Sequence, residues 1–193
     1  MKKLAIFGGS FDPIHNAHIQ MSLFALKNFE LSKLIFVPAF MSPHKTNQDY
    51  APAKDRLKML ELASKHIPKT DISTYEIEKN EPVFTYQTLD YFQAIYDSYE
   101  IYMLLGSDSF LNLQFWKKID YIASKFRFIV AKRLDYPIVE TSKFLNICEF
   151  LGEGIENISS SQIKFLIKNK DENVKNFLDK KVCTYITQKR LYL

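Results

Sequence analysis

A short apolar run near the start of the chain, ending in two glycines, constrains the fold more than any other feature. The run covers residues 4–7 and is followed directly by Gly8 and Gly9, which predicts a buried strand ending at a tight turn. Residues 16–30 are apolar with scattered polar positions and predict a helix. A strand, a glycine turn and a helix bring backbone N–H groups and a helix N-terminus to one place, where proteins commonly hold phosphate.

Two histidines fall at the same place. His15 and His18 are three positions apart, so on a helix they project from neighbouring positions of one face. Imidazoles beside a phosphate cradle can donate hydrogen bonds to a charged transition state. The alternative is a zinc half-site, but the chain has four histidines, two distant cysteines and no H-E-x-x-H or C-x-x-C spacing. The pattern therefore predicts chemistry on a nucleotide phosphate and no dedicated metal site.

Length and composition favour one α/β domain over residues 1–193. The chain has 193 residues, of which 47% are hydrophobic and 15% aromatic, as in a packed globular protein. The net charge of +4 suits a phosphate-bearing substrate and also a lysine-rich surface. No Lys/Arg block and no basic stripe with interleaved aromatics occurs, so nucleic-acid binding is not expected.

The same sequence predicts a cytoplasmic location without membrane association. The first apolar run is too short for a signal peptide, and no apolar stretch approaches the roughly 20 residues of a membrane span. Cys148 and Cys183 lie in apolar or helical contexts, which predicts reduced, buried thiols.

Strand-like and helical runs alternate, which predicts a parallel sheet with crossover helices. Strands are predicted at residues 4–7, 33–37, 71–77, 101–105, 127–131 and 146–151. Helices are predicted at residues 16–30, 52–67, 84–99, from 159 onward, and at 174–191. Ligands of such sheets bind beyond the carboxyl ends of the strands. The polar motifs that follow strands are the Gly8 turn, Pro43-His44-Lys45 and Gly106-Ser107-Asp108.

A serine cluster forms the second strong motif. Ile158 and the three serines after it precede a helical pattern, with Lys164 one turn into that helix. Serines there give an N-cap and free N–H donors at the positive end of the helix dipole. By itself the motif indicates only a capped helix. Beside the histidine block it predicts a second phosphate-binding element.

Read as one block, the N-terminal motif resembles the signature of the H-x-G-H nucleotidyltransferase superfamily. More narrowly, the chain is similar to bacterial nicotinate-nucleotide adenylyltransferases over nearly its whole length. That resemblance implies a Rossmann-like α/β fold with helices on both faces of a parallel sheet, in a single nucleotidyltransferase domain. It implies adenylyl transfer from ATP to nicotinate mononucleotide, giving deamido-NAD and pyrophosphate, with Mg²⁺ bound mainly through ATP phosphates and water. A homo-oligomer is left open.

The resemblance also implies roles for individual residues. The implied catalytic residues are His15, His18 and Lys45. The implied ATP-binding residues are Gly8, Gly9, Ser10, Phe11, Gly106, Asp108, Ile158, Ser159, Ser160, Ser161 and Lys164. The implied mononucleotide-binding residues are His44, Lys45, Thr85, Trp116 and Lys117.

The chain departs from the family pattern at several positions. Ala17 replaces a glycine, which is tolerable where φ is negative. Ser161 and Lys164 replace the threonine and arginine of the I-S-S-T-x-x-R motif, and lysine keeps the charge but lacks the bidentate fork. Ser42 replaces the first proline of P-P-H-K, and only Thr85 remains of an S-Y-T element.

Alternatives stay open at this stage. Phosphopantetheine adenylyltransferases also carry a serine-rich motif, but they have threonine where His15 stands and are shorter. An inactive nucleotide-binding regulator is the rival from another class. From the residues alone, Asp108 is a helix N-cap or a ribose ligand, and Trp116 is a core residue or a stacking platform. Arg56 is either a solvated charge or a positioning group, and the solvated role is favoured slightly.

Overall fold

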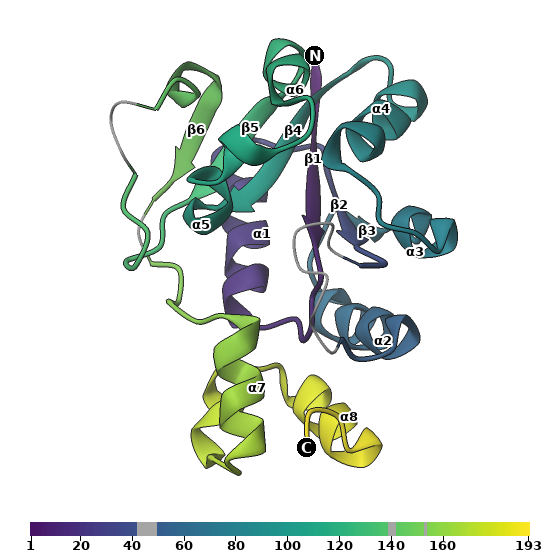
Figure 1. The fold of residues 1–193 in the computed structure, drawn as a ribbon, viewed down its shortest axis with the longest axis vertical. Coiled ribbons are helices and arrows are strands. Elements are labelled where there is room, and N and C mark those ends of the chain that lie inside the picture. Colours follow the sequence, from purple (N-terminus) through teal and green to yellow (C-terminus); the bar gives the residue numbers. More distant parts are fainter. Residues whose placement is uncertain (42–49, 139–141, 153) are drawn as a thin grey trace.

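The computed structural model describes residues 1–41, 50–138, 142–152 and 154–193. Its centre is a six-stranded sheet in the order β3-β2-β1-β4-β5-β6, and all five pairings are parallel (Figure 1). The strands are β1 (Lys2–Gly9), β2 (Lys33–Pro38), β3 (Thr70–Ile72), β4 (Tyr99–Gly106), β5 (Arg127–Ala131) and β6 (Cys148–Leu151). The predicted doubly covered parallel sheet is confirmed.

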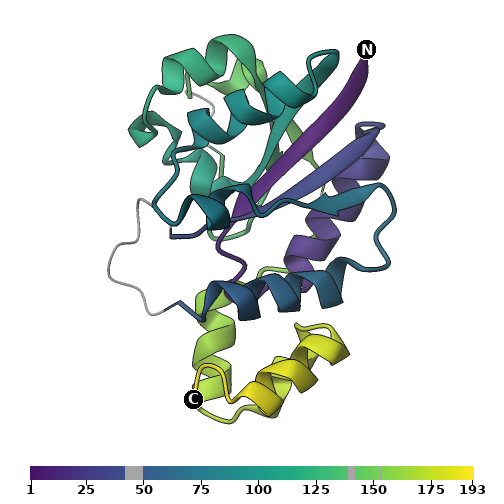
Figure 2. The same ribbon diagram turned by 90° about the vertical axis from the view of Figure 1, so that its right-hand side faces the viewer.

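Helices cover both faces of this sheet because its buried strands alternate between two apolar layers. Ala5 and Phe7 of β1 belong to one core cluster, and Leu4 and Ile6 belong to the other. The first cluster takes residues from α1 (Asn16–Asn28), α2 (Ala53–Ser64), α7 (Ser160–Lys168) and α8 (Lys180–Lys189). The second takes residues from α4 (Thr85–Ile95), α5 (Ser107–Phe110) and α6 (Ile119–Lys125). Figures 1 and 2 place α7 and α8 at the end of the molecule toward which the strands point.

The predicted strand at residues 71–77 is wrong in its second half. β3 ends at Ile72, and α3 (Tyr75–Lys79) follows. The Tyr75 ring stacks on Tyr91 of α4 with 3.9 Å between centroids, and the Thr88 hydroxyl donates to Glu76 Oε1 at 2.6 Å. A few alternating residues are compatible with the period of two of a strand and with the period of 3.6 of a helix. Packing against α4 stabilises the helical conformation here.

The predicted helix at residues 174–191 is two elements. A 3₁₀ turn spans Glu172–Asn176, and α8 begins at Lys180. Asp179 caps α8 by accepting from the backbone N–H of Lys181 at 2.7 Å and of Val182 at 3.4 Å. Aspartate is a strong N-cap residue, so the break has a local cause. Two further 3₁₀ turns span Leu113–Phe115 and Leu145–Ile147.

The two cysteines agree with the sequence prediction in their redox state but not in their burial. Cys148 and Cys183 are free thiols, as expected, but they are half-buried where buried thiols were expected. Burial raises the pKa of the Cys148 thiol to about 12.

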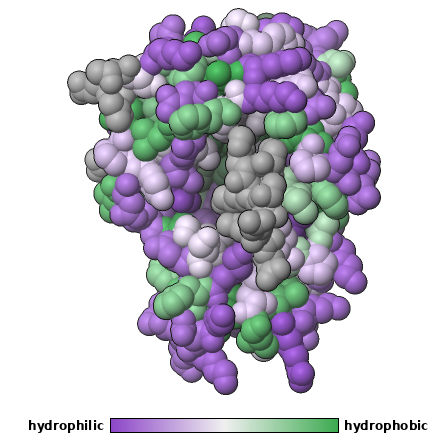
Figure 3. Space-filling model, in the orientation of Figure 1, coloured by the Kyte–Doolittle hydropathy of each residue, from purple (hydrophilic) through white to green (hydrophobic). Residues whose placement is uncertain are grey.

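Figure 3 shows hydrophilic residues spread over one face, with hydrophobic residues in smaller groups between them. None of the helices in the described part of the chain has the length and apolar character needed to cross a bilayer.

Candidate active site

The cleft of this protein lies at the carboxyl ends of β1 and β4, the two central strands. Strand order reverses between them, and such switch points are where open α/β sheets bind ligands. The cleft holds two adjoining cavities, a larger one of about 600 Å³ and a smaller one of about 180 Å³. Their shared wall is formed by Gly8, Gly9, Ser10, Leu105, Asp108 and Ser109.

The predicted glycine turn is displaced toward the histidines. Gly8 and Gly9 belong to β1, and the positive φ of 46° occurs at Phe11. A Cβ at Gly8 would lie 3.2 Å from Met103 Cε, and one at Gly9 would lie 3.2 Å from the Phe11 ring. Close packing, not a left-handed turn, therefore favours glycine at these two positions. Phe11 itself is buried, with its ring edge-on to His18 at 5.2 Å, so it packs behind the His18 ring and does not line either cavity.

His15 and His18 meet at the start of α1 and both line the smaller cavity. Their rings stack with 3.7 Å between centroids, and the His15 backbone N–H donates to His18 Nδ1 at 3.3 Å. An Nδ1 that accepts an amide proton leaves Nε2 as the protonated nitrogen of the neutral ring. Ala17, between them, is buried within α1 and is not among the residues with positive φ, so its extra methyl is accommodated.

Both imidazoles are neutral at pH 7. Burial lowers the pKa of His15 well below its usual value, and the electrostatic effects of the adjacent His18 and of Arg133 lower it further. Burial and the Arg133 charge lower the pKa of His18 to about 3. The pair therefore contributes N–H donors to the cavity and not two positive charges.

These pKa shifts predict a pH-dependent stability. The unfolded chain protonates His18 near 6.5 and the folded chain only near 3, so the unfolded state binds more protons in that window. The free energy of unfolding should therefore fall as pH drops from 6.5 toward 4.5. One such group contributes a slope of up to about 1.4 kcal/mol per pH unit, and His18→Gln should lose that slope. Urea unfolding from pH 4.5 to 7 measures it.

Glu76→Gln is the matched control with the opposite sign. Burial raises the pKa of Glu76 from 4.5 to about 7, so its contribution to stability is lost as pH rises through that window. Relative to wild type, removing Glu76 should make stability rise more steeply with pH. Parallel wild-type and His18→Gln curves would contradict the assignment of a buried neutral imidazole.

The serine motif forms the capped start of α7, as predicted. Ser159 Oγ accepts from the Gln162 backbone N–H at 3.3 Å, while the Ser159 N–H donates to Gln162 Oε1 at 2.8 Å. The backbone N–H groups of Ser160 and Ser161 have no acceptor among the described residues. The Ser160 hydroxyl donates to the Pro13 carbonyl at 3.0 Å, which fixes this helix end against the N-terminal motif. All three serines line the smaller cavity.

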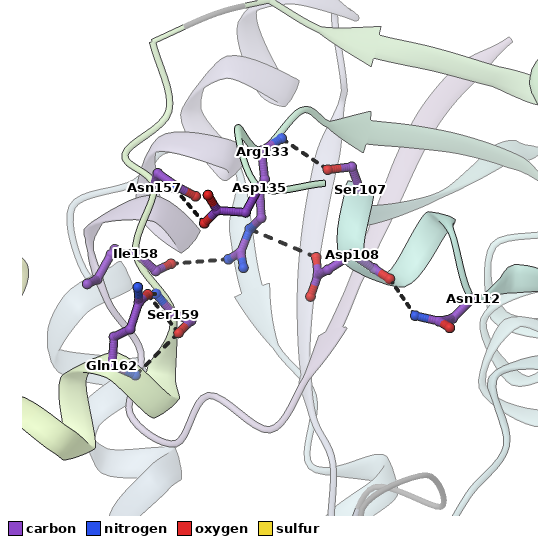
Figure 4. A network of polar contacts seen from close by, with 9 residues as sticks. All are labelled: Ser107, Asp108, Asn112, Arg133, Asp135, Asn157, Ile158, Ser159 and Gln162. Carbon is purple, nitrogen blue, oxygen red and sulfur yellow. Dashed lines mark hydrogen bonds and ion pairs between the residues drawn. The ribbon is translucent and has the colours of Figure 1, made fainter. Parts of the chain in front are cut away.

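Arg133, just after β5, is a cavity residue that the sequence pattern did not predict. Its Nη2 donates to the Ile158 carbonyl at 3.3 Å, and its backbone N–H donates to Ser107 Oγ at 3.0 Å. Its Nε lies 3.9 Å from Asp108 Oδ1 and is buried without a hydrogen-bond partner. Figure 4 shows the guanidinium between α5 and the start of α7. The available signal was a pair of basic residues, Lys132 and Arg133, directly after a predicted strand.

Asp108 is not the N-cap of its helix. It lies inside the first turn of α5, after the N-cap residue Gly106, and it lines both cavities. Its carboxylate is free of backbone capping and faces Arg133 (Figure 4). The carboxylate therefore lies at the shared wall of the two cavities, and its role as a ribose ligand stays a prediction. Gly106 lines the smaller cavity, whereas Ile158 is buried beside it and contributes its carbonyl to Arg133.

Lys164 reaches the smaller cavity through an ion pair that the sequence did not predict. Its Nζ lies 3.0 Å from Asp12 Oδ2. The Asp12 side chain is buried, whereas the Lys164 side chain is 25% exposed. The ammonium is thus held at the cavity wall by a buried carboxylate.

Arg56 is buried, so its interpretation as a solvated charge is wrong. It is 1% exposed and donates to three backbone carbonyls: Ser10 at 2.8 Å, Phe40 at 3.0 Å and Ala51 at 3.1 Å. A buried guanidinium is stable only when its donors are matched. The three carbonyls come from three separate places in the chain, and Arg56 thereby ties the N-terminal motif to α2.

The larger cavity contains three of the predicted mononucleotide residues, Thr85, Trp116 and Lys117. Trp116 is half-buried, with its ring 6.5 Å from Phe128, so one part packs on the core and another borders the cavity. Lys117 Nζ lies 4.2 Å from the centre of the Phe84 ring. Glu76 lines the same cavity and was not predicted, because its place depended on the misassigned α3.

The structure does not describe two of the predicted mononucleotide-binding residues. His44 and Lys45 lie outside the described residues. Within the described ranges, no group of three or more histidine, cysteine, aspartate or glutamate side chains could hold a metal ion.

The parallel sheet and its cleft are those of a Rossmann-like nucleotidyltransferase. The sequence matches the cytidylyltransferase-like family over residues 6–166. A protein of Endomicrobium trichonymphae named probable nicotinate-nucleotide adenylyltransferase is 49% identical over 193 residues, with 100% of both chains covered. One of the same name from Clostridium tetani is 33% identical over 201 residues, again with 100% of both covered. The chain therefore belongs to the cytidylyltransferase-like family and, within it, to the nicotinate-nucleotide adenylyltransferases, which confirms the resemblance.

A solved structure agrees with the fold. Plasmodium falciparum nicotinic acid mononucleotide adenylyltransferase complexed with NaAD superimposes with a TM-score of 0.83 at 22% identity, over 100% of this chain and 98% of that one. At this identity the likeness shows a shared architecture.

Proposed function

We propose that this protein transfers the adenylyl group of ATP to nicotinate mononucleotide, giving deamido-NAD and pyrophosphate. The observation that carries the proposal is the pair of adjoining cavities. One is lined by imidazoles, a helix N-terminus and two cationic side chains, and the other by Trp116, Thr85 and apolar groups. Two nucleotides bound there would meet at the shared wall. The names of the full-length relatives support the same reaction.

On the ATP side, the chain's own residues supply alignment and charge stabilisation. The mononucleotide phosphate attacks the α-phosphorus in line, and pyrophosphate leaves with the electron pair of the broken P–O bond. His18 Nε2–H would donate to the α-phosphate oxygens, where charge redistributes in the transition state. The N–H groups of Ser160 and Ser161, with Lys164 and Arg133, would hold the departing pyrophosphate. Asp108 would accept from ribose hydroxyls.

Mg²⁺ would reach the cavity bound to ATP. The described residues supply no carboxylate cluster, so Mg²⁺ would be held by ATP phosphate oxygens and water. It would neutralise charge on the triphosphate while Lys164 and Arg133 act on the same anion from the protein side.

On the mononucleotide side, Trp116 would stack on the pyridine ring, and groups near Thr85 and Lys117 would hold the nicotinate carboxylate. Glu76 borders this space, and its raised pKa of about 7 keeps a large share of it uncharged at neutral pH. A neutral Glu76 avoids repelling the substrate carboxylate. Soluble nucleotide substrates and free thiols also favour the proposed cytoplasmic location.

Nicotinate mononucleotide should be the preferred acceptor in a pyrophosphate-release assay with ATP. Nicotinamide mononucleotide should be used less well by at least about tenfold in kcat/KM, because a site arranged for a carboxylate leaves donors mismatched against an amide. Phosphopantetheine is the third arm and tests the rival adenylyltransferase. Equal turnover of the nicotinamide compound would contradict the carboxylate pocket. Turnover of phosphopantetheine alone would replace the proposed function.

A further inference from the structure

A buried junction lies beside the smaller cavity and joins four stretches of chain that are far apart in sequence. Its centre is Asp12, which is 0% exposed. Asp12 Oδ1 accepts from the Ala51 backbone N–H at 3.1 Å and from the Tyr192 hydroxyl at 2.7 Å. Asp12 Oδ2 accepts from Lys164 Nζ at 3.0 Å. We call these four residues the Asp12 junction.

The two carboxylate oxygens of Asp12 bind different donors in this junction. Oδ1 is occupied by two neutral donors, and Oδ2 is left for the ammonium of Lys164. A buried carboxylate requires matched donors. If Oδ1 lost the Tyr192 hydroxyl, the Lys164 ammonium, which already binds the same carboxylate, would be a strong donor in place to compensate. Its movement toward Oδ1 would withdraw it from the cavity wall.

Tyr192 is suited to hold that arrangement. It follows α8, with a φ of 66°, and its hydroxyl donates to Asp12 in the N-terminal motif. Burial and the Asp12 charge raise the pKa of the Tyr192 phenol, so it stays a protonated donor. The chemistry assigned above to the cleft makes no use of this hydroxyl.

We propose that Tyr192 is a positioning residue for phosphate binding: by occupying Asp12 Oδ1 it directs Oδ2 to Lys164 and keeps the ammonium at the cavity wall. The proposal rests on the proposed function for the identity of the phosphate ligand. It makes the segment after α8 a working part of the ATP site and explains how a lysine serves there without the arginine fork.

Tyr192→Phe tests the proposal, with Tyr185→Phe as the matched control. The Tyr185 hydroxyl donates to Asp55 Oδ1 at 2.7 Å, so it also ties α8 to α2, but it has no contact with Asp12 or Lys164. Tyr192→Phe should raise the KM for ATP and the Kd for inorganic pyrophosphate by about tenfold, the scale of one hydrogen bond to a charged group. Tyr185→Phe should leave both constants within about twofold. Unfolding midpoints of the two variants show whether their stability losses match.

A double-mutant cycle with Lys164→Ala decides whether Tyr192 acts through Lys164. In the Lys164→Ala background, Tyr192→Phe should change the KM for ATP by less than about twofold, because coupled residues are non-additive. A full additional loss there, or equal effects of the two tyrosine variants on pyrophosphate binding, would overturn the proposal. A wild-type protein that binds pyrophosphate but makes no deamido-NAD refutes the proposed function and still tests the junction. A wild type that binds neither ATP nor pyrophosphate overturns both.

Discussion

Replacing His18 with alanine should lower kcat by about a hundredfold or more while changing ATP affinity far less. Charge on the α-phosphate oxygens changes between ground and transition state, so a preorganised Nε2–H donor contributes mainly to the latter. Because the pKa of His18 is about 3, the loss should be the same across neutral pH. Single-turnover rates and calorimetric ATP binding on folded protein measure the two quantities separately.

Two amide variants separate the nitrogens of His18. His18→Asn keeps an acceptor near Nδ1 for the His15 N–H and removes the Nε2 donor, so it should be about as slow as alanine. His18→Gln places an amide donor near Nε2 and should recover part of the rate. The exposed His66 provides the control His66→Ala, which should be unaffected. Normal turnover by His18→Asn would remove this ring from the catalytic centre.

Replacing Lys164 with alanine should raise the KM for ATP by about tenfold or more and also slow the chemical step. The variant removes one cation from the triphosphate and its departing pyrophosphate. It also leaves buried Asp12 without its ion-pair partner, so kinetics must be read at a temperature well below the measured unfolding midpoint. Lys164→Arg should be tolerated, since the guanidinium fork can serve both Asp12 and phosphate.

Lys168→Ala, an exposed position on the same helix, is the control for effects on α7 itself. It should leave ATP kinetics unchanged. If Lys164→Ala also leaves KM and kcat unchanged, Lys164 has only a structural role in its pairing with Asp12.

Much of the fold follows from interactions between residues close together in the chain. Apolar runs at residues 33–37, 101–105 and 127–131 predict three strands that the structure confirms, since a strand buried on both faces needs nearly continuous apolar residues. The serine motif predicts the start of α7 because an N-cap is satisfied within a few residues. The Gly8 turn and Gly106-Ser107-Asp108 were expected in the cleft because the carboxyl ends of adjacent parallel strands share one edge, whereas the roles of Thr85, Trp116 and Lys117 were implied by the family resemblance.

The burial of Arg56 and the helix at residues 75–79 depend on contacts between distant segments. Such contacts cannot be predicted from hydrophobic periodicity or from helix-capping motifs. Arg56 is buried only because carbonyls of Ser10 and Phe40 converge on it. Residues 75–79 become helical through packing against α4, which also brings Glu76 to the larger cavity.

The smaller cavity shows most clearly which features the local sequence determined and which depended on the tertiary structure. Local sequence chemistry determined that two histidines follow the first strand and that serines cap the helix carrying Lys164, and the family resemblance implied that both bind one nucleotide. Only the tertiary structure decided that Arg133 faces those histidines and that Asp12 holds Lys164 with the help of Tyr192. The physical reason is desolvation: a charge becomes sensitive to distant partners once the folded chain removes its water, and that burial is not encoded in any short stretch of sequence.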